Sequence, residues 1–146
     1  MYEIFKEFTF EAAHHLAVNV AVGHPYAQLH GHSFRVEVYL RGEPDKDKNW
    51  LYDFGEIDKE IIKLRAVLDH TYLNDIDGLG IPTLENISRW IWRRLQNQLP
   101  GLDRVLVRRG SCGEGCVYSD RARGLIRTGS SSPTARDRIS APVRCC

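Results

Sequence analysis

The sequence predicts an α+β fold in which two helices cover an antiparallel four-stranded sheet, with the elements in the order β-β-α-α-β-β. Apolar and polar residues alternate with period two early in the chain, which predicts half-buried strands. Apolar residues recur at helical spacing in the middle of the chain, which predicts two helices that each bury one face. The 146 residues, 42% of them hydrophobic, suffice for one domain with a sizeable core.

Two strands are predicted before the helices. The first covers residues 2–13, where aromatic and β-branched side chains are dense and where Ile4, Phe8 and Phe10 share one parity. The second is clearer, because four apolar side chains alternate with polar or aromatic ones over residues 34–41. These four are Phe34, Val36, Val38 and Leu40.

The two helices are predicted over residues 54–68 and 84–95, since each segment carries an apolar stripe. The stripes are Ile57, Ile61, Leu64 and Leu68 in the first helix and Leu84, Ile87, Ile91 and Leu95 in the second. Thr83 is a candidate N-cap of the second helix, and Glu85 lies in its first turn, where the helix dipole favours negative charge. Two further strands are predicted, over residues 104–108 and 116–118.

We expect one domain over residues 1–118, followed by an Arg-rich tail over residues 119–146. The tail has no periodic pattern and little to bury, so we expect it to be disordered. It carries six Arg and two Asp, which leaves the rest of the chain with a net charge of −3. This acidic body argues against a nucleic-acid partner, because phosphate contacts need clustered Lys and Arg.

Nothing in the sequence predicts a membrane or an oxidising compartment. The chain has no run of about 18 apolar residues, which a membrane-spanning helix needs. Its first residues lack the basic start and the apolar stretch of a signal peptide. All four cysteines lie at position 112 or later, so disulfides cannot staple the fold. We therefore expect a cytoplasmic protein.

Three histidines form the candidate metal site. His30-Gly31-His32 stands at the start of the second strand, and side chains two apart on a strand share a face. If the first two strands are antiparallel neighbours, His14 or His15 at the end of the first strand joins them. Three imidazoles that leave a fourth position open are typical of catalytic zinc sites. The alternative is solvated or hydrogen-bonded histidine beside a strand.

Two charged dipeptides also require an interpretation. In Asp69-His70, a carboxylate that orients the imidazole would make a general acid or base. From spacing alone, a histidine at a helix C-terminus with a nearby surface aspartate is favoured. Arg108-Arg109 could attract phosphate, although a solvent-facing strand end is the simpler interpretation.

Several short motifs occur together and in order. They are Phe8-Thr-Phe-Glu-Ala-Ala-His14, Leu29-His30-Gly31-His32-Ser33-Phe34, Asp53-Phe54, Leu68-Asp69-His70-x-Tyr-Leu-Asn74, Pro82-Thr83-x-Glu85-Asn86 and Cys112-x-x-x-Cys116-x-Tyr118. In this combination the chain resembles the 6-pyruvoyltetrahydropterin synthase superfamily. It is most similar to the bacterial branch, the 6-carboxytetrahydropterin synthases (QueD) of queuosine biosynthesis. The resemblance covers residues 2–118.

The resemblance implies a tunnelling fold that trimerises into a barrel and stacks two barrels into a hexamer, with active sites between subunits. It implies Zn²⁺ bound by the positions of His14, His30 and His32, and 7,8-dihydroneopterin triphosphate as the substrate. Asp69 and His70 match a pair that assists proton transfer. Thr83 and Glu85 match the substrate-binding motif. In the carboxy branch the reaction releases triphosphate and a two-carbon fragment as acetaldehyde.

Two positions depart from the family's pattern. The usual catalytic Cys, four residues before His30, is Tyr26, and a phenol with a pKa of about 10 is a poorer base than a thiol near 8.5. The usual pterin-anchoring Glu is Gly110, with Glu114 the nearest substitute in sequence. We therefore expect a 6-carboxytetrahydropterin synthase-like lyase. The alternatives are a paralogue that forms a 6-hydroxymethyl-dihydropterin and a non-catalytic zinc- or pterin-binding oligomer.

Overall fold

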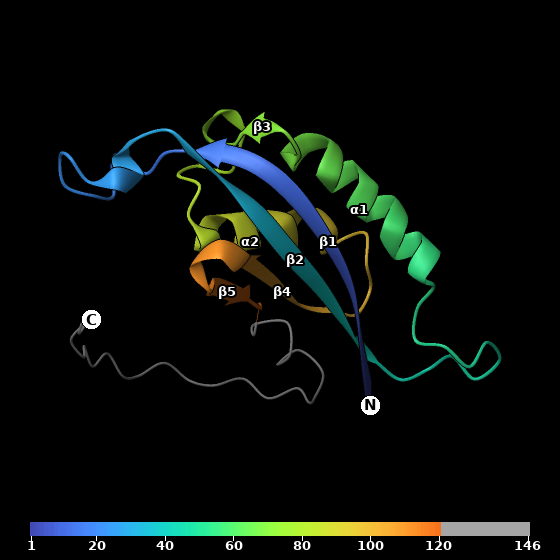
Figure 1. The fold of residues 1–146 in the computed structure, drawn as a ribbon. Helices are drawn as coiled ribbons and strands as arrows, with labels where there is room; N and C mark the ends of the chain where they lie inside the picture. The colour runs from blue at the N-terminus through green and yellow to red at the C-terminus, as the bar shows by residue number, and fades with distance from the viewer. Residues whose placement is uncertain (121–146) are drawn as a thin grey trace, which may run out of the picture.

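The structure is a computed structural model that describes residues 1–120 (Figure 1). The predicted tail therefore lies outside the described residues from position 121 on. The elements are β1 (Tyr2–His14), β2 (His30–Gly42), α1 (Phe54–Leu68), β3 (Thr71–Tyr72), α2 (Leu84–Leu95), β4 (Leu102–Arg109) and β5 (Glu114–Tyr118). None of the helices described here has the length and apolar character needed to cross a membrane.

The predicted α+β class and its four antiparallel strands are confirmed, and the sheet gains one short strand. Its order is β3-β1-β2-β4-β5. β3 has two residues and runs parallel to β1, with Thr71 opposite Ala12. A strand of this length has no period for the sequence to show. β2 also starts earlier than predicted, because the His30-Gly31-His32 motif pairs with β1 as part of the strand.

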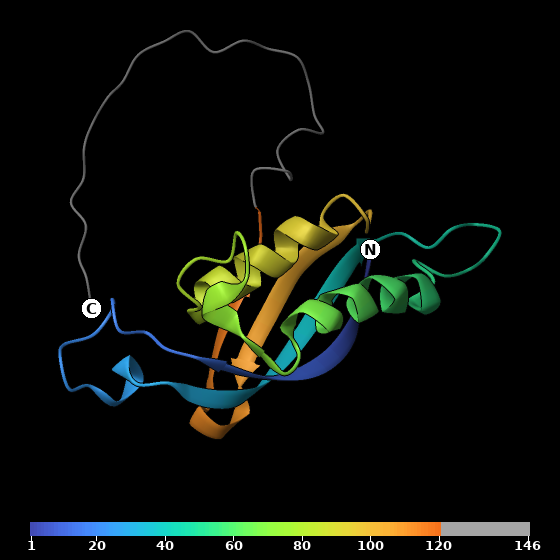
Figure 2. The same ribbon diagram turned by 90° about the horizontal axis from the view of Figure 1, so that it is seen from above.

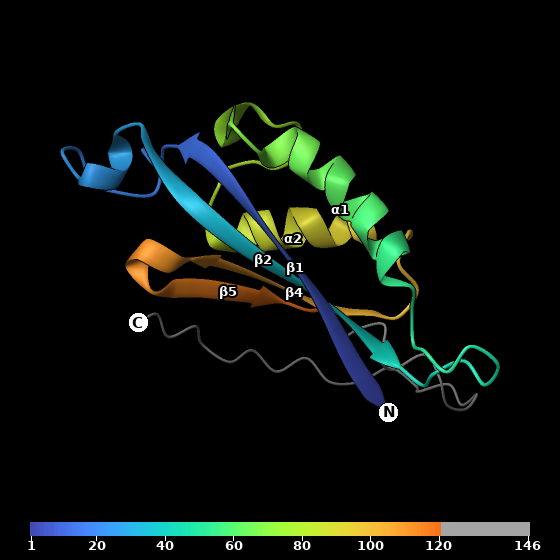
Figure 3. The same cartoon turned by 45° about the vertical axis from the view of Figure 1, so that its right-hand side comes forward.

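Both helices pack on one face of the sheet (Figure 2), and in Figure 3 the strands stand in front of α2. This face carries the predicted alternating residues, with Val36, Val38 and Leu40 buried under the apolar stripes of α1 and α2. The opposite face is charged. There Arg104 pairs with Glu3, and further ion pairs join neighbouring strands. The sheet therefore has one apolar, helix-covered face and one polar, open face.

The helix starts follow from their caps. Asp53 Oδ1 accepts a hydrogen bond from the Gly55 N–H at 2.7 Å, which caps α1. Thr83 Oγ1 accepts from the Asn86 N–H at 3.3 Å, so the predicted N-cap of α2 is confirmed. The connection between β1 and β2 projects beyond the end of the sheet at which β1 stops (Figure 1). The candidate site lies at this end.

Candidate functional site

The pairing of β1 with β2 brings the three predicted histidines together. His14 is directly opposite His30, and Ala12 is opposite His32, so all three side chains share the helix-covered face. The ring centroid of His14 lies 4.5 Å from that of His30 and 5.2 Å from that of His32. One ligand nitrogen from each residue lies within 4.8 Å of the other two. We call these residues the histidine cluster.

Backbone carbonyls fix the tautomers of two cluster members. His14 Nδ1 is 2.9 Å from the Pro82 carbonyl, and His30 Nδ1 is 2.8 Å from the Gln28 carbonyl. A carbonyl only accepts hydrogen bonds, so each Nδ1 donates and each neutral ring keeps its lone pair on Nε2. Both Nε2 atoms are buried and have no hydrogen-bond partner within residues 1–120. Two orphaned, convergent lone pairs of this kind fit a divalent cation.

Burial lowers the pKa of two members of the cluster. His14 is only 1% exposed, and burial lowers its pKa to about 4, with His30, His32 and Arg109 adding electrostatic repulsion. Burial also lowers the pKa of His32, followed by the charge of Arg109. A metal needs the neutral imidazole, and His14 has this form at neutral pH. Of the alternative interpretation, a solvated or hydrogen-bonded histidine, the solvated form does not describe His14, but His14 is hydrogen-bonded through Nδ1 to the Pro82 carbonyl.

His15, the other candidate for the third ligand, lies outside the cluster. Its parity places it away from the helix-covered face. Its Nδ1 accepts a hydrogen bond from the Ala17 N–H at 3.3 Å, and its ring lies 6.0 Å from that of Tyr72. Strand alternation therefore decides between the two neighbours in favour of His14.

Tyr26 lies beside the histidine cluster. It belongs to a single turn of 3₁₀ helix, where its backbone N–H bonds to His24 Nδ1 at 3.1 Å and its carbonyl accepts from the Leu16 N–H at 2.8 Å. Its ring stacks on that of His30, with centroids 5.6 Å apart and an interplanar angle of 24°. The Tyr26 ring thus lies at the border of the histidine cluster, whereas its role there stays a prediction.

Asp69 and His70 form a pair that is anchored to β1. The Glu11 N–H donates to Asp69 Oδ1 at 2.9 Å, and the His70 N–H donates to the Glu11 carbonyl at 2.6 Å. His70 Nδ1 lies 3.2 Å from Asp69 Oδ1, and Arg65 holds the other carboxylate oxygen. The bond from Glu11 is the main reason that the pKa of Asp69 is lowered, and His70 and Arg65 add to it. Asp69 is therefore a fixed anion that orients the imidazole.

The structure does not bring His70 to the histidine cluster of the same chain. Its side chain is 79% exposed, and no ring contact joins it to the cluster among the described residues. It borders a cavity of about 480 Å³ together with Glu11 and Ser33, and one cluster member, His32, also lines this cavity. His70 has φ of +56°, a left-handed conformation that is uncommon outside glycine and asparagine. Such strain outside a glycine is often found at functional sites.

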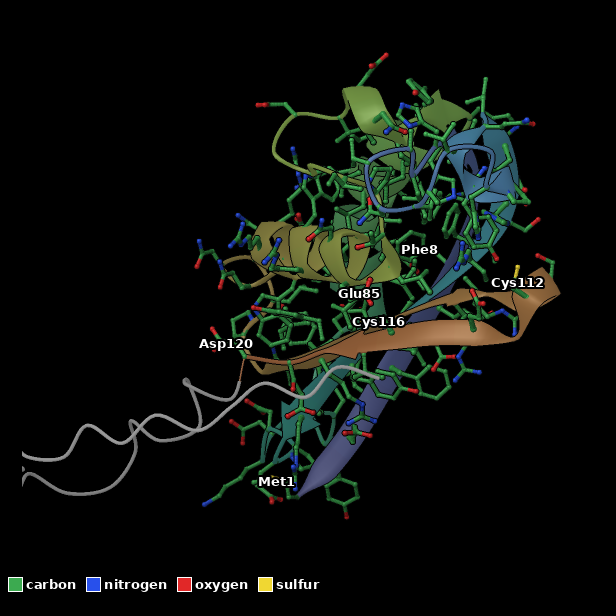
Figure 4. All side chains as sticks on the ribbon, turned by 90° about the vertical axis from the view of Figure 1, so that its left-hand side faces the viewer. Met1, Phe8, Glu85, Cys112, Cys116 and Asp120 are labelled. Carbon is green, nitrogen blue, oxygen red and sulfur yellow. The ribbon has the colours of Figure 1, made fainter. Side chains whose placement is uncertain are left out.

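The start of α2 lies next to the cluster, because Pro82 accepts the hydrogen bond of His14. Thr83 follows as the N-cap, and Glu85 is exposed in the first turn. Figure 4 labels Glu85 on α2 near Cys116 of β5, whereas Cys112 stands at the turn between β4 and β5. Neither Thr83 nor Glu85 makes a side-chain bond to the histidines within residues 1–120.

Arg109 is a site residue that the sequence interpretation missed. The expected solvent-facing strand end is wrong for it, because Arg109 is only 8% exposed. Its Nη1 is 3.4 Å from His32 Nε2, its Nη2 forms an ion pair with Glu114, and its Cζ lies 5.8 Å from the Tyr26 ring centroid. The signal was the alternation of β4, in which Arg109 continues the parity of the buried Val105 and Val107.

Comparisons with known proteins agree with this geometry. The sequence profile of the 6-pyruvoyl tetrahydropterin synthase family matches residues 3–121. The chain is 36% identical over 132 residues to the 6-carboxy-5,6,7,8-tetrahydropterin synthase of Synechocystis sp., covering 86% of this chain and 100% of that protein. It is also 36% identical over 112 residues to the dihydroneopterin monophosphate aldolase of Pyrococcus furiosus, covering 77% and 89%.

A solved structure shares the fold. The 6-pyruvoyl tetrahydropterin synthase of Caenorhabditis elegans superimposes with a TM-score of 0.73 at 22% identity, covering 82% of this chain and 95% of that one.

Proposed function

The chain belongs to the 6-pyruvoyl tetrahydropterin synthase family, and on this premise we propose that it is a zinc-dependent, 6-carboxy-5,6,7,8-tetrahydropterin synthase-like lyase. Its substrate would be 7,8-dihydroneopterin triphosphate, in the cytoplasmic route to the queuosine precursor. The convergence of three imidazoles carries the proposal, because the Nε2 atoms of two of them are buried without partners among the described residues. The 36% identity to the 6-carboxy-5,6,7,8-tetrahydropterin synthase of Synechocystis sp. supports the carboxy branch.

His14, His30 and His32 would hold the zinc ion. When bound, zinc supplies a Lewis acid that polarises a hydroxyl of the substrate side chain. The protein's own contribution is preorganisation. The carbonyls of Pro82 and Gln28 hold two rings in the ligating tautomer, and the buried position of His14 keeps water away from that side.

Asp69 and His70 would move the proton. The carboxylate holds Nδ1, so Nε2 of an exposed imidazole remains to take a proton from the substrate or return it. Because His70 is not joined to the cluster of its own chain, we propose that it acts on the cluster of a neighbouring subunit. This requires a homo-oligomer, a trimer or a hexamer, with sites between subunits.

Other residues would bind the substrate. Thr83 and Glu85 lie at the α2 start beside His14, and Glu114 borders the same cavity as Gly110. Tyr26 lies against His30 and is the candidate for the second proton-transfer group, in the place of the family's Cys. These assignments are proposals that rest on the family's motif and on the proximity described above.

The direct test is incubation of the zinc-loaded protein with 7,8-dihydroneopterin triphosphate and analysis of the products by mass. We expect triphosphate, acetaldehyde and 6-carboxy-5,6,7,8-tetrahydropterin. Absence of triphosphate release above a protein-free control would contradict the proposal. Mixing His14→Ala subunits with His70→Asn subunits tests the shared site, because mixed oligomers should regain activity that each variant lacks alone.

A second candidate is cleavage of the side-chain carbon–carbon bond alone, giving a 6-hydroxymethyl-dihydropterin. Two observations favour it, namely Tyr26 in place of Cys and the 36% identity to a protein named dihydroneopterin monophosphate aldolase. The same product analysis separates the two activities. Release of neither product would leave a non-catalytic zinc- or pterin-binding oligomer.

A further inference from the structure

Arg109 places a buried cation at the edge of the histidine cluster. The guanidinium group reaches His32 Nε2 with Nη1 at 3.4 Å, a long contact that leaves much of its donor capacity free. Nη2 is paired with Glu114, whose side chain is 46% exposed. Nε is buried and has no hydrogen-bond partner within residues 1–120. Among the described residues, Glu114 is thus the one acidic side chain that forms an ion pair with Arg109, and its carboxylate is partly exposed to solvent.

This arrangement is costly for the fold alone. Arg109 continues the inward-facing row of Val105 and Val107, where an apolar side chain would bury without penalty. A buried charge with an unsatisfied hydrogen-bond donor lowers the stability of the folded protein, and a second acceptor would remove this penalty. A planar guanidinium is suited to carboxylate and phosphate oxygens, which it can bind with paired hydrogen bonds.

There is room for such an acceptor. Arg109, Gly110 and Glu114 border a cavity of about 720 Å³ at this end of the sheet, which Arg35 and Arg108 also line. Gly110 presents no side chain to this space, and the guanidinium also lies near Tyr26 and His32. Because its Nη1 is 3.4 Å from His32 Nε2, the guanidinium of Arg109 is placed to meet a ligand bound at the histidine cluster.

We propose that Arg109, positioned by Glu114, binds an oxyanion carried by the side chain of the ligand at the histidine cluster, and so selects anionic pterins over uncharged ones. The oxyanion is a carboxylate or a phosphate. This inference rests on the proposed function, since it assumes a pterin ligand at that cluster. Arg109 is then a specificity-determining residue, and Glu114 is a positioning residue.

The test measures the binding of two matched ligand pairs to zinc-loaded protein by pterin fluorescence. Pterin-6-carboxylate is compared with 6-hydroxymethylpterin, and neopterin monophosphate with neopterin. The variants are Arg109→Gln, Glu114→Gln and the matched control Arg41→Gln, whose exposed side chain on β2 lies outside that cavity. Zinc content and melting temperature are recorded for each variant.

We expect the wild type and Arg41→Gln to prefer at least one anionic ligand over its uncharged partner. Arg109→Gln should weaken that anionic ligand by about tenfold or more and leave the uncharged partner nearly unchanged. If only one pair responds, that pair identifies the oxyanion as carboxylate or phosphate. Equal weakening of both members of each pair, or no weakening, would overturn the inference.

Glu114→Gln keeps the test decisive if Arg109→Gln does not fold. Freed from its carboxylate, Arg109 should hold the anionic ligand several-fold less tightly, and an unchanged anion preference would contradict the inference. Wild-type protein that binds zinc and pterins without any anion preference would also refute it, while leaving the proposed function intact. Wild-type protein that binds neither zinc nor any pterin would refute the proposed function itself.

Discussion

The metal-free protein should lose stability on acidification through His14. Burial lowers the pKa of His14 from 6.5 to about 4. Between these two pH values, His14 is therefore protonated in the unfolded chain but neutral in the folded chain. Stability is then full above pH 6.5 and falls as the pH drops toward 4. A shift of this size corresponds to at most about 3 kcal/mol.

The measurement is urea unfolding of chelator-treated protein at several pH values between 7.5 and 4. The matched variant is His14→Gln, whose amide can still donate to the Pro82 carbonyl but does not titrate. The stability advantage of the wild type over this variant should shrink steadily below pH 6.5. Parallel pH profiles for the two proteins would show that burial does not keep His14 neutral. They would contradict the claim that its Nε2 lone pair is kept available for a metal ion.

Three further substitutions test other parts of the site. His70→Asn keeps a side chain that tolerates the left-handed backbone, so the melting temperature should hold while product formation falls about 100-fold; retained turnover would remove His70 from the mechanism. Asn74→Ala deletes both bonds between its amide and the His15 backbone, at 3.0 and 3.1 Å, and should lower the free energy of unfolding by about 1–2 kcal/mol in urea titrations. Tyr26→Phe keeps the ring stacked on His30, so zinc content should be unchanged while turnover falls by about 100-fold; full activity would assign the proton to another group.

The sequence was sufficient to predict that the histidines of the cluster come together, because strand alternation and strand pairing are regular and short-range. Strand alternation fixes which side chains share a face, and antiparallel pairing of consecutive strands places the end of β1 beside the start of β2. The same reasoning located both helices, since their apolar stripes repeat every turn. His14 and the His30-Gly31-His32 motif come together because strand alternation and antiparallel strand pairing together determine which side chains are neighbours.

Contacts without a periodic signal were not predictable. The bonds between Asp69-His70 and Glu11 join positions almost 60 residues apart, and they form beside a two-residue strand. The spacing favoured a helix-terminal histidine with a surface aspartate, and His70 does follow the end of α1. What spacing could not show is that β1 holds the carboxylate in place.

For Arg109 the prediction was wrong for a different reason. The alternation of β4 indicated a buried side chain, but the charge of arginine favoured a solvent-facing interpretation. Its parity on β4 is that of two buried valines, yet its charge suggested solvent. The long arginine side chain resolves this conflict, because it runs under the sheet edge to Glu114 and His32. Polar residues that keep the parity of a buried row therefore warrant examination as site residues.

Zinc binding by single alanine variants tests the central claim most directly. Metal analysis and zinc titration should find one ion per wild-type chain, and affinity should fall by about 100-fold or more in His14→Ala, His30→Ala and His32→Ala. His15→Ala is the matched control, because His15 adjoins the cluster in sequence but points elsewhere, and it should bind zinc like the wild type. A His14→Ala protein that holds as much zinc as its parent would contradict the account.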